Sequence, residues 1–288
     1  MFWSRKGRNK FAGTPATAIS VETGEPVACM LTDAGCCRES NEDAARIVRV
    51  HGDDQTDRGL LAIVADGMGG HQAGEVASRT AVETVEREYS MLPGTPGEAL
   101  EAAFRRAHVA ILKLAKSNPD MAGMGTTCTA IAIVGQQAWA VHVGDSRLYL
   151  MREGEIYQLS EDHTQCMEMV RKGLLTMEES KRHADRNVLT HAMGTRDELV
   201  LMTWPESMLV KPRDVFMLCS DGLHDLVSDA EIGQMVRDTV PSLACRNLIR
   251  MARERGGYDN ITLVVVAVPP MTHGAAVLRE TGEYEVSK

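Results

Sequence analysis

Four aspartates of this sequence stand where an apolar, strand-like run begins or ends. Asp66 and Asp221 each follow an apolar run, and Asp145 follows a segment of alternating polarity. Asp259 comes just before the run Ile-Thr-Leu-Val-Val-Val-Ala-Val. A single Asp-Gly pair is an ordinary turn dipeptide. Four acidic strand ends in one chain indicate a shared site, because a protein interior does not accept carboxylates that have no partner.

The loop that follows Asp66 has the composition of a segment that approaches a ligand closely. Residues 66–71 read Asp-Gly-Met-Gly-Gly-His. The glycines allow a tight turn and bring backbone carbonyls toward whatever the carboxylate holds. A hard cation is the natural occupant of such an oxygen-rich site. His71 is a candidate proton donor in this loop, and the alternative is that it only fixes the loop.

The kinds of donor atom favour Mg²⁺ or Mn²⁺ over zinc. These ions prefer oxygen ligands, whereas zinc recruits His or Cys, and three of the four acidic strand ends lack His. Two such ions about 3.5–4 Å apart can activate a water and clamp a phosphoryl group. The guanidinium of Arg38 matches phosphate geometry, with Glu42 and Asp43 close behind it. A surface ion pair is the alternative role for Arg38.

The elements that must position these residues follow a pattern typical of one domain with helices and strands. Strands are predicted near 27–32, 44–50, 60–65, 125–134, 137–143, 146–151, 155–159, 198–204, 214–219 and 261–268. Helices are predicted near 74–90, 97–117, 229–237 and 241–255, and short helical pieces at 166–172 and 177–183 lie in a flap at about 164–197. Tight polar connections indicate antiparallel pairing, because parallel pairing needs longer crossovers.

Composition and the two ends of the chain limit the class of protein. Residues 1–26 are predicted to form a mobile leader, residues 27–269 the domain, and residues 270–288 a polar tail. Lys and Arg number 31 against 40 Asp and Glu, so the net charge of −9 disfavours nucleic acid as a partner. No apolar run approaches the roughly 20 residues that span a membrane, and the basic N-terminus is followed by no secretion signal. We therefore expect no membrane partner and a cytoplasmic location.

The seven cysteines have no spacing typical of a metal site. Cys128 and Cys219 lie inside apolar strands, which indicates reduced, intracellular thiols. Cys36 and Cys37 are adjacent and come just before Arg38. We expect both to be small core-facing residues, and the sensing of oxidation is the alternative.

Eight short motifs, in their order and spacing, resemble the metal-dependent protein phosphatases, the PPM or type 2C family. They are RESNED at 38–43, VADGMGGHQAGE at 64–75, GTT at 125–127, GDSRLY at 144–149, DHT at 162–164, RNVLT at 186–190, CSDGL at 219–223 and YDNIT at 258–262. The resemblance runs from about residue 31 to residue 268, and the loop after Asp66 is closer to the bacterial branch. It implies an α+β fold, a four-layer α-β-β-α sandwich of two antiparallel sheets flanked by helices, with the flap as an insertion.

The same resemblance implies a set of ligands for two Mn²⁺ or Mg²⁺ ions. Asp66 would bridge both ions, and the carbonyl of Gly67 would bind one of them. Asp221 and Asp259 would complete the site on the other side. Asp145, together with Asp221, would help to hold a third and weaker ion.

Four further residues receive supporting roles from the resemblance. Asp43 and Glu42 would act mainly through metal-bound water. Arg38 would bind the substrate phosphate, and Asn260 would order the site beside Asp259. The implied reaction is hydrolysis of phosphoserine or phosphothreonine in proteins by a metal-activated water, without a phosphoenzyme. Phosphorylated proteins and an opposing Ser/Thr kinase are the expected partners, and a monomer is expected.

The sequence departs from the family at three positions. Met68 stands where animal members carry a histidine that is thought to be the general acid, so the proton donor is unassigned. His191 and Met193 stand where relatives often carry Arg and Leu, which puts contacts between flap and substrate in doubt. His163 is expected to be structural, with hydrogen bonds beneath the flap.

Three other functions remain as alternatives. The motifs fix the reaction and not the leaving group, so the substrate could be a single dedicated regulator or a small phosphomonoester. A non-catalytic scaffold that binds phosphoproteins would have lost metal ligands, yet Asp66, Asp221 and Asp259 are all present. A nuclease would also use two metals, but the acidic charge of the chain opposes it.

Overall fold

The computed structural model describes residues 17–19, 25–52, 57–70, 72–237 and 239–270. Its strands are β1 (Thr17–Ile19), β2 (Val27–Asp33), β3 (Asp43–His51), β4 (Asp57–Met68), β5 (Gly125–Thr126), β6 (Cys128–Val134), β7 (Gln137–Val143), β8 (Arg147–Arg152), β9 (Glu155–Gln158), β10 (Met202–Thr203), β11 (Met208–Leu209), β12 (Val215–Cys219) and β13 (Ile261–Ala267). Its helices are α1 (Gln72–Met91), α2 (Pro96–Ser117), the 3₁₀ helix η1 (Pro119–Met121), α3 (Gln165–Arg171), α4 (Met177–Ser180), α5 (Asp221–His224), α6 (Asp229–Arg237) and α7 (Pro241–Glu254).

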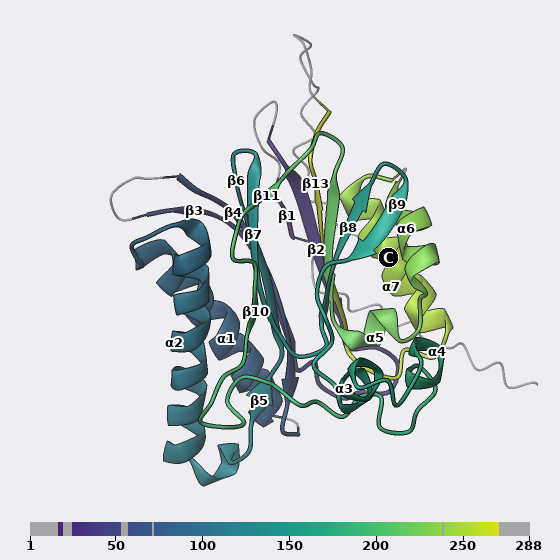
Figure 1. The fold of residues 1–288 in the computed structure, drawn as a ribbon. Helices are drawn as coiled ribbons and strands as arrows, with labels where there is room; N and C mark the ends of the chain where they lie inside the picture. Colours follow the sequence, from purple (N-terminus) through teal and green to yellow (C-terminus); the bar gives the residue numbers. More distant parts are fainter. Residues whose placement is uncertain (1–16, 20–24, 53–56, 71, 238, 271–288) are drawn as a thin grey trace, which may run out of the picture.

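Two antiparallel sheets lie face to face, and helices cover the outer face of each (Figure 1). One sheet has the strand order β1-β2-β13-β12-β8-β9, and α6 and α7 lie outside it. The other has the order β10-β7-β6-β4-β3, with β11 paired to β7 and β5 to β4, and α1 and α2 lie outside it. The predicted four-layer α-β-β-α sandwich is therefore confirmed.

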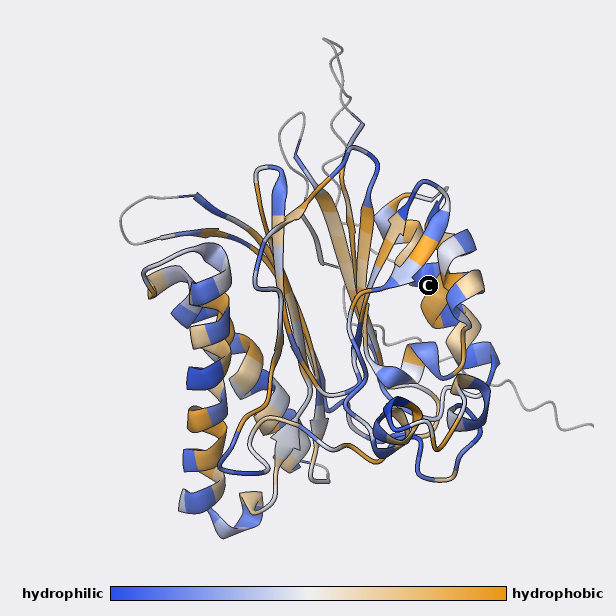
Figure 2. Ribbon diagram, viewed as in Figure 1, coloured by the Kyte–Doolittle hydropathy of each residue, from blue (hydrophilic) through white to orange (hydrophobic). Residues whose placement is uncertain are grey.

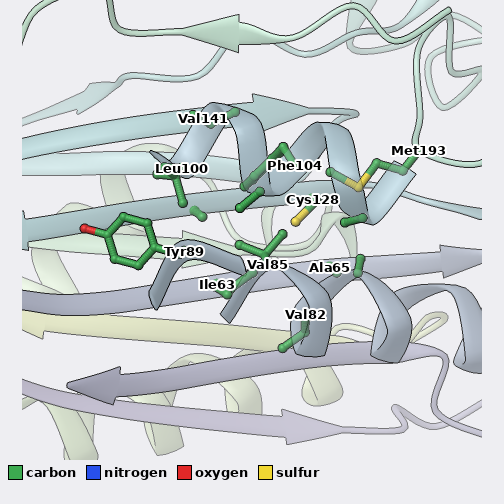
Figure 3. Packing of buried hydrophobic residues seen from close by; sticks show 14 of the residues in the cluster. Ile63, Ala65, Val82, Val85, Tyr89, Leu100, Phe104, Cys128, Val141 and Met193 are labelled. Carbon is green, nitrogen blue, oxygen red and sulfur yellow. The ribbon is translucent and has the colours of Figure 1, made fainter. Parts of the chain in front are cut away.

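The layers are held together by apolar residues on the inner faces of the helices and on both faces of the sheets (Figure 2). On α1, Ala77 and Ala81 are fully buried, and these small side chains let the helix approach its sheet closely. Phe104 of α2 fills the same layer (Figure 3). Tyr89 is buried beside it and donates its hydroxyl to the carbonyl of Arg58 at 2.9 Å, which satisfies its polar end.

The helix that closes this layer begins at a capping motif that the sequence contains in full. Thr95 precedes Pro96, and its side chain accepts from the amide of Glu98, while the Glu98 carboxylate accepts from the Thr95 amide. Two amides of the first turn that would otherwise have no partner are thus satisfied. The predicted start of the helix near residue 97 is therefore confirmed to within one residue.

Most predicted elements are found where the sequence places them, but several differ, and η1 and β11 were not predicted. Residues 198–204 were expected to form a strand, but only Met202 and Thr203 pair with β7. The short helix α5 was not predicted, because four residues are too few for a helical period to show. β1 lies within the segment 1–26 that was expected to precede the domain, and it pairs antiparallel with β2.

The cysteines divide into two groups. Cys128 and Cys219 are fully buried, as predicted, and none of the seven cysteines forms a disulfide. The expectation that Cys36 and Cys37 face the core is wrong, because both are exposed. They lie in the loop between β2 and β3, outside the apolar layers. Within the described ranges, no helix is both long enough and apolar enough to cross a membrane.

Candidate metal centre and active site

The register of two neighbouring strands brings the first two acids together. Asp43 begins β3 and stands directly opposite Asp66 of β4. Side chains of opposite residues in an antiparallel pair are neighbours on one face of the sheet. The prediction that the strand ends before Asp66 is wrong, because β4 continues to Met68 and pairs with β5 through Gly67 and Thr126.

Gly67 is required by the close approach of two other backbone segments. A Cβ at this position would lie 2.2 Å from the carbonyl oxygen of Gly74, in the first turn of α1. It would also lie 2.6 Å from the carbonyl oxygen of Glu42, to which the Gly67 amide donates at 3.2 Å. Any side chain would therefore push α1 away from the end of β4, and Asp66 would lose its position.

Ser220 joins the second sheet to the first. Its hydroxyl donates to Asp43 Oδ2 at 2.8 Å and accepts from the amide of Thr262 at 3.0 Å. Ser220 follows the last residue of β12 and leads directly into Asp221, the first residue of α5. Ser220 thereby links Asp43, in one sheet, to Asp221, at the end of the other sheet.

Among the described residues, no Lys or Arg forms an ion pair with four carboxylates at this end of the sheets, of which Asp43 and Asp145 are buried and Asp66 and Asp221 are half-buried. Burial first, and then the charges of Asp221 and Asp259, raise the pKa of Asp43 to about 7. Burial and neighbouring acids likewise raise the pKa of Asp221 to about 6 and raise the pKa of Asp66 and of Asp145 well above their ordinary values.

Two oxygen atoms of this group have no hydrogen-bond partner. Oδ1 of Asp43 and Oδ1 of Asp221 are both buried and unsatisfied. Buried acceptors without a donor are costly, so a native site that keeps them calls for a cation or another donor. Aspartate oxygens in such number are the ligands that Mn²⁺ and Mg²⁺ prefer.

The side chains do not already form a finished ligand shell. Among the residues described, no three His, Cys, Asp or Glu side chains are arranged so that they could hold an ion between them. Two of the acids are instead engaged by donors of the protein, Asp43 by Ser220 and Asp259 by Arg38. The unpaired buried oxygens still favour a bound cation, because a carboxylate rotates at far lower cost than a buried charge is left unpaired.

Arg38 forms an ion pair with Asp259, which is the alternative role given for it above, and its binding of a phosphate stays a prediction. Its Nη2 donates to Asp259 Oδ2 at 2.6 Å, and the two side chains are 51% and 37% exposed. The hydrogen bond with Asp259, and then the charges of Glu42 and Asp66, raise the pKa of Arg38. The guanidinium has five N–H donors, so this one bond leaves others that can face solvent and a ligand.

Asn260 orders the loop that carries Arg38. Its side-chain amide donates to the carbonyls of Ala34 at 3.1 Å and Ser40 at 2.9 Å, and its Oδ1 accepts from the amide of Glu42 at 2.8 Å. Three backbone groups of the loop between β2 and β3 are thus fixed by one buried side chain. This geometry agrees with the ordering role expected for Asn260.

Asp145 is placed by its backbone and not by a side-chain partner. It is 7% exposed, and its carbonyl oxygen accepts from His224 Nε2 at 3.0 Å. His224 is the last residue of α5, so this bond ties the Asp145 loop to the helix that begins with Asp221. Burial lowers the pKa of His224 to about 4, so the ring is neutral near pH 7.

The flap, with α3 and α4, lies at the same lower edge of the sandwich as α5 (Figure 1). Arg186 and Asn187 both donate to Asp225 Oδ2, at 3.0 and 3.2 Å. His163 is buried and bonded beneath the flap, which confirms its expected structural role. Met193 is fully buried and exchanges two backbone hydrogen bonds with Thr126, so its side chain belongs to the core.

One predicted site residue lies outside the described part of the chain, and three residues of the site were not predicted. His71 lies outside the described residues, so its predicted role stays a prediction. Sequence reasoning did not find Ser220, His224 or Asp225. Ser220 directly precedes a predicted ligand, which was a usable signal, whereas His224 and Asp225 act through contacts with distant loops that no local pattern shows.

Comparisons with known proteins agree with this geometry. The family model "Protein phosphatase 2C" matches residues 38–254. The chain is 37% identical over 244 residues to the serine/threonine protein phosphatase PstP of Mycobacterium tuberculosis, with 84% of this chain and 45% of PstP covered. It is 34% identical over 245 residues to the protein phosphatase PhpP of Streptococcus pneumoniae, with 83% of this chain and 96% of PhpP covered.

The fold is also similar to that of a solved structure. The catalytic domain of PstP in complex with two manganese ions matches with a TM-score of 0.72 and 34% identity, with 85% of this chain and 98% of that chain covered. The chain thus spans less than half the length of PstP and nearly the whole of its catalytic domain. The predicted resemblance and fold are confirmed.

Proposed function

This chain belongs to the protein phosphatase 2C family, and from this membership we propose that it is a metal-dependent phosphatase of phosphoserine and phosphothreonine in proteins. The observation that carries the proposal is the group of buried, uncompensated aspartates at one edge of the sandwich, with Arg38 beside it. Acids alone repel a phosphate, and an arginine alone does not activate water. The combination suits hydrolysis of a phosphate ester once cations are bound.

The residues that would hold two Mn²⁺ or Mg²⁺ ions are Asp66, the carbonyl of Gly67, Asp221 and Asp259, with Asp43 and Glu42 next to them. When bound, the ions supply an activated water and neutralise the charge of the phosphoryl oxygens. Asp145 is the acid available for a third and weaker ion. Support comes from the unpaired oxygens of Asp43 and Asp221 and from the two manganese ions in the structure of the PstP catalytic domain.

Arg38 would orient the substrate. Its guanidinium is fixed from one side by Asp259, which leaves further N–H groups to donate to phosphate oxygens. Asn260 holds the loop of Arg38, so the anion-binding group and the acids keep a constant relation. His71 is the proposed proton donor in the loop after Asp66.

We further propose that phosphorylated proteins are the substrates, that a Ser/Thr kinase opposes this enzyme, and that it acts as a monomer in the cytoplasm. Support for protein substrates comes from the names of PstP and PhpP, both protein phosphatases. A non-catalytic scaffold is disfavoured, because a protein that had lost its metals would gain stability by replacing its buried, uncompensated acids. A phosphatase of one dedicated regulator differs only in the substrate.

The test is release of phosphate from phosphothreonine, phosphoserine and phosphotyrosine peptides by the purified chain, with Mn²⁺, with Mg²⁺ and with chelator. We expect release from phosphothreonine and phosphoserine that depends strictly on the metal. Folded protein that releases no phosphate from any peptide with either metal would contradict the general phosphatase. A pull-down from phosphorylated cell extract would then separate the scaffold from the dedicated phosphatase.

A further inference from the structure

His163 binds both backbone polar groups of the residue before Asp145. Its amide donates to the carbonyl of Gly144 at 2.8 Å, and its Nδ1 accepts from the amide of Gly144 at 3.3 Å. His163 is 8% exposed, so water does not readily replace these bonds. The loop that carries Asp145 is therefore held from this side by a single residue.

The same residue also holds the end of the flap. Its carbonyl accepts from the amide of Thr190 at 2.8 Å. Its ring lies between those of His142 and His191, with centroids 5.0 and 5.3 Å away. His142 belongs to β7, while His191 follows the flap motif, so the three rings join sheet, Asp145 loop and flap.

Close contacts leave the Asp145 loop little freedom to form other hydrogen bonds in place of those between Gly144 and His163. Gly144 has a φ of +107°, and a Cβ there would lie 2.5 Å from the side chain of Thr127. Thr127 in turn shares a hydrogen bond of 2.7 Å with Ser146, on the other side of Asp145. The tight packing at Gly144 and the Thr127–Ser146 hydrogen bond thus limit the movement of the Asp145 loop.

We propose that His163 is a positioning residue, which fixes the Asp145 loop and the end of the flap relative to one another through its Nδ1 acceptor and its backbone. The inference rests on the proposed function, in which Asp145 serves a metal ion. Partners that orient metal ligands from behind commonly change metal affinity about 10- to 100-fold when they are removed. The consequence is that one substitution should alter both the weakest metal site and the flap.

The chemistry of the acceptor supplies a discriminating set of variants. Because Nδ1 accepts an N–H, the ring must be unprotonated at that atom. Asn places a carbonyl oxygen near the position of Nδ1, whereas Gln places it further out and Ala has none. His163→Asn should therefore keep the bond to Gly144, and His163→Gln and His163→Ala should lose it.

A second histidine of the chain provides a matched control. His108 of α2 is 4% exposed, and its Nδ1 accepts from the amide of Gly194 at 3.1 Å, which is the same kind of bond at a distance from Asp145. His108→Ala should lower the unfolding temperature without changing Mn²⁺ affinity. It therefore separates a general loss of packing from the proposed coupling.

Two measurements test the proposal. Hydrogen exchange of metal-free protein reports the segments 143–149 and 187–191, and calorimetric titration with Mn²⁺ reports each binding step. We expect His163→Ala and His163→Gln to speed exchange in both segments and to weaken the weakest Mn²⁺ step about 10-fold or more, while His163→Asn stays within about 3-fold of wild type.

Each outcome decides the proposal. Wild-type exchange and Mn²⁺ affinity in His163→Ala would overturn it, and so would a His163→Asn variant as impaired as His163→Ala, because the acceptor would then not matter. Faster exchange in only one of the two segments would overturn the coupling. If wild-type protein bound no Mn²⁺, the proposed function would fail, and exchange in the metal-free variants would still decide the role of His163.

Discussion

Two groups of acids in this molecule differ in whether an arginine forms an ion pair with them. Asp162 accepts from Arg147 Nε and Nη2 at 3.0 and 2.7 Å, and Asp214 accepts from Arg152 in the same two-bond manner at 2.8 and 2.6 Å. Burial alone would raise the pKa of Asp162, yet the bonds from Arg147 bring it below its ordinary value. The pKa of Asp162 is lowered because an arginine lies beside it, and Asp214 is paired with an arginine in the same arrangement.

The acids at the edge of the sandwich have no such partner. Asp43, Asp66, Asp145 and Asp221 all have a raised pKa, first because of burial and then because of the charges of neighbouring acids. The fold can therefore neutralise a buried acid with its own arginine and does not do so here. We infer that these four acids are arranged for a cation that the chain itself does not supply.

The largest expected effect comes from removing one acid of the uncompensated group. We expect Asp66→Asn to lower Mn²⁺-dependent phosphate release at least about 1000-fold, because a proposed metal ligand loses its charge. The metal-free protein should unfold at the same or a higher temperature, since a repelling charge has gone. Activity assays and thermal unfolding with chelator check both parts.

Asp197→Asn is the control for that comparison. Asp197 is an exposed acid that pairs with Lys116, so its amide variant should change neither quantity. Turnover near the wild-type rate in Asp66→Asn would refute the proposed site.

For the acids that are paired with an arginine, we expect the opposite result, a loss of stability when the partner is removed. Arg147→Met leaves Asp162 buried and uncompensated, so we expect a loss of about 3–5 kcal/mol in the free energy of unfolding. Urea unfolding measures this loss. The double variant Arg147→Met with Asp162→Asn should recover part of it, because no unpaired charge then remains. A single variant as stable as wild type would show that the arginine is not needed there.

The pH dependence of stability sharpens the comparison further. The folded-state pKa of Asp221, about 6, lies above its ordinary value of 3.8. Folded protein therefore binds more protons than unfolded protein between these values, and the stability from this group falls as pH rises through that window. Asp221→Asn has no such loss, so the metal-free variant should gain on wild type from pH 4 to pH 6, by on the order of 2 kcal/mol.

The comparison of wild type with Asp221→Asn removes the titrations that Asp221 does not influence. The charge of Asp221 also raises the pKa of Asp43, Asp66 and Asp145, so their contribution to the difference has the same sign as that of Asp221. The buried histidines are the same in both proteins, so their contribution cancels in the difference. Urea unfolding at several pH values with chelator gives the result. A difference that does not change with pH would mean that Asp221 is charged and compensated without metal. Adding Mn²⁺ at pH 7.5 should make wild type the more stable of the two.

The smallest effect is expected for the exposed ion pair of Arg38 and Asp259. Arg38→Ala should raise KM for a phosphothreonine peptide about 10-fold, because a charge-assisted contact with phosphate is lost. Arg79 provides a control, since it is similarly exposed and pairs with Glu75 on α1. Steady-state kinetics measure both variants, and equal KM values for Arg38→Ala and wild type would rule out the phosphate-binding role.

Local patterns in the sequence were enough to predict most elements and several site residues. Alternating or apolar runs that end in Asp-Gly marked Asp66 and Asp221, and an Asp-Asn pair before an apolar run marked Asp259. These signals are local, because strand period and turn glycines depend on neighbours in the chain. The exposure of Cys36 and Cys37 was not accessible in this way, since small residues suit both a core and a loop.

The amino-acid sequence alone was enough to propose which residues carry the chemistry, because carboxylates, glycines and an arginine at strand ends can be recognised without knowledge of contacts. Only the tertiary structure decided how they meet. The register of β3 and β4 sets Asp43 opposite Asp66, and Ser220 reaches Asp43 across 177 residues of chain. Which buried acids receive an arginine and which do not also depends on such distant contacts. Pairings of this kind follow from the packing of whole sheets, and no window of neighbouring residues contains them.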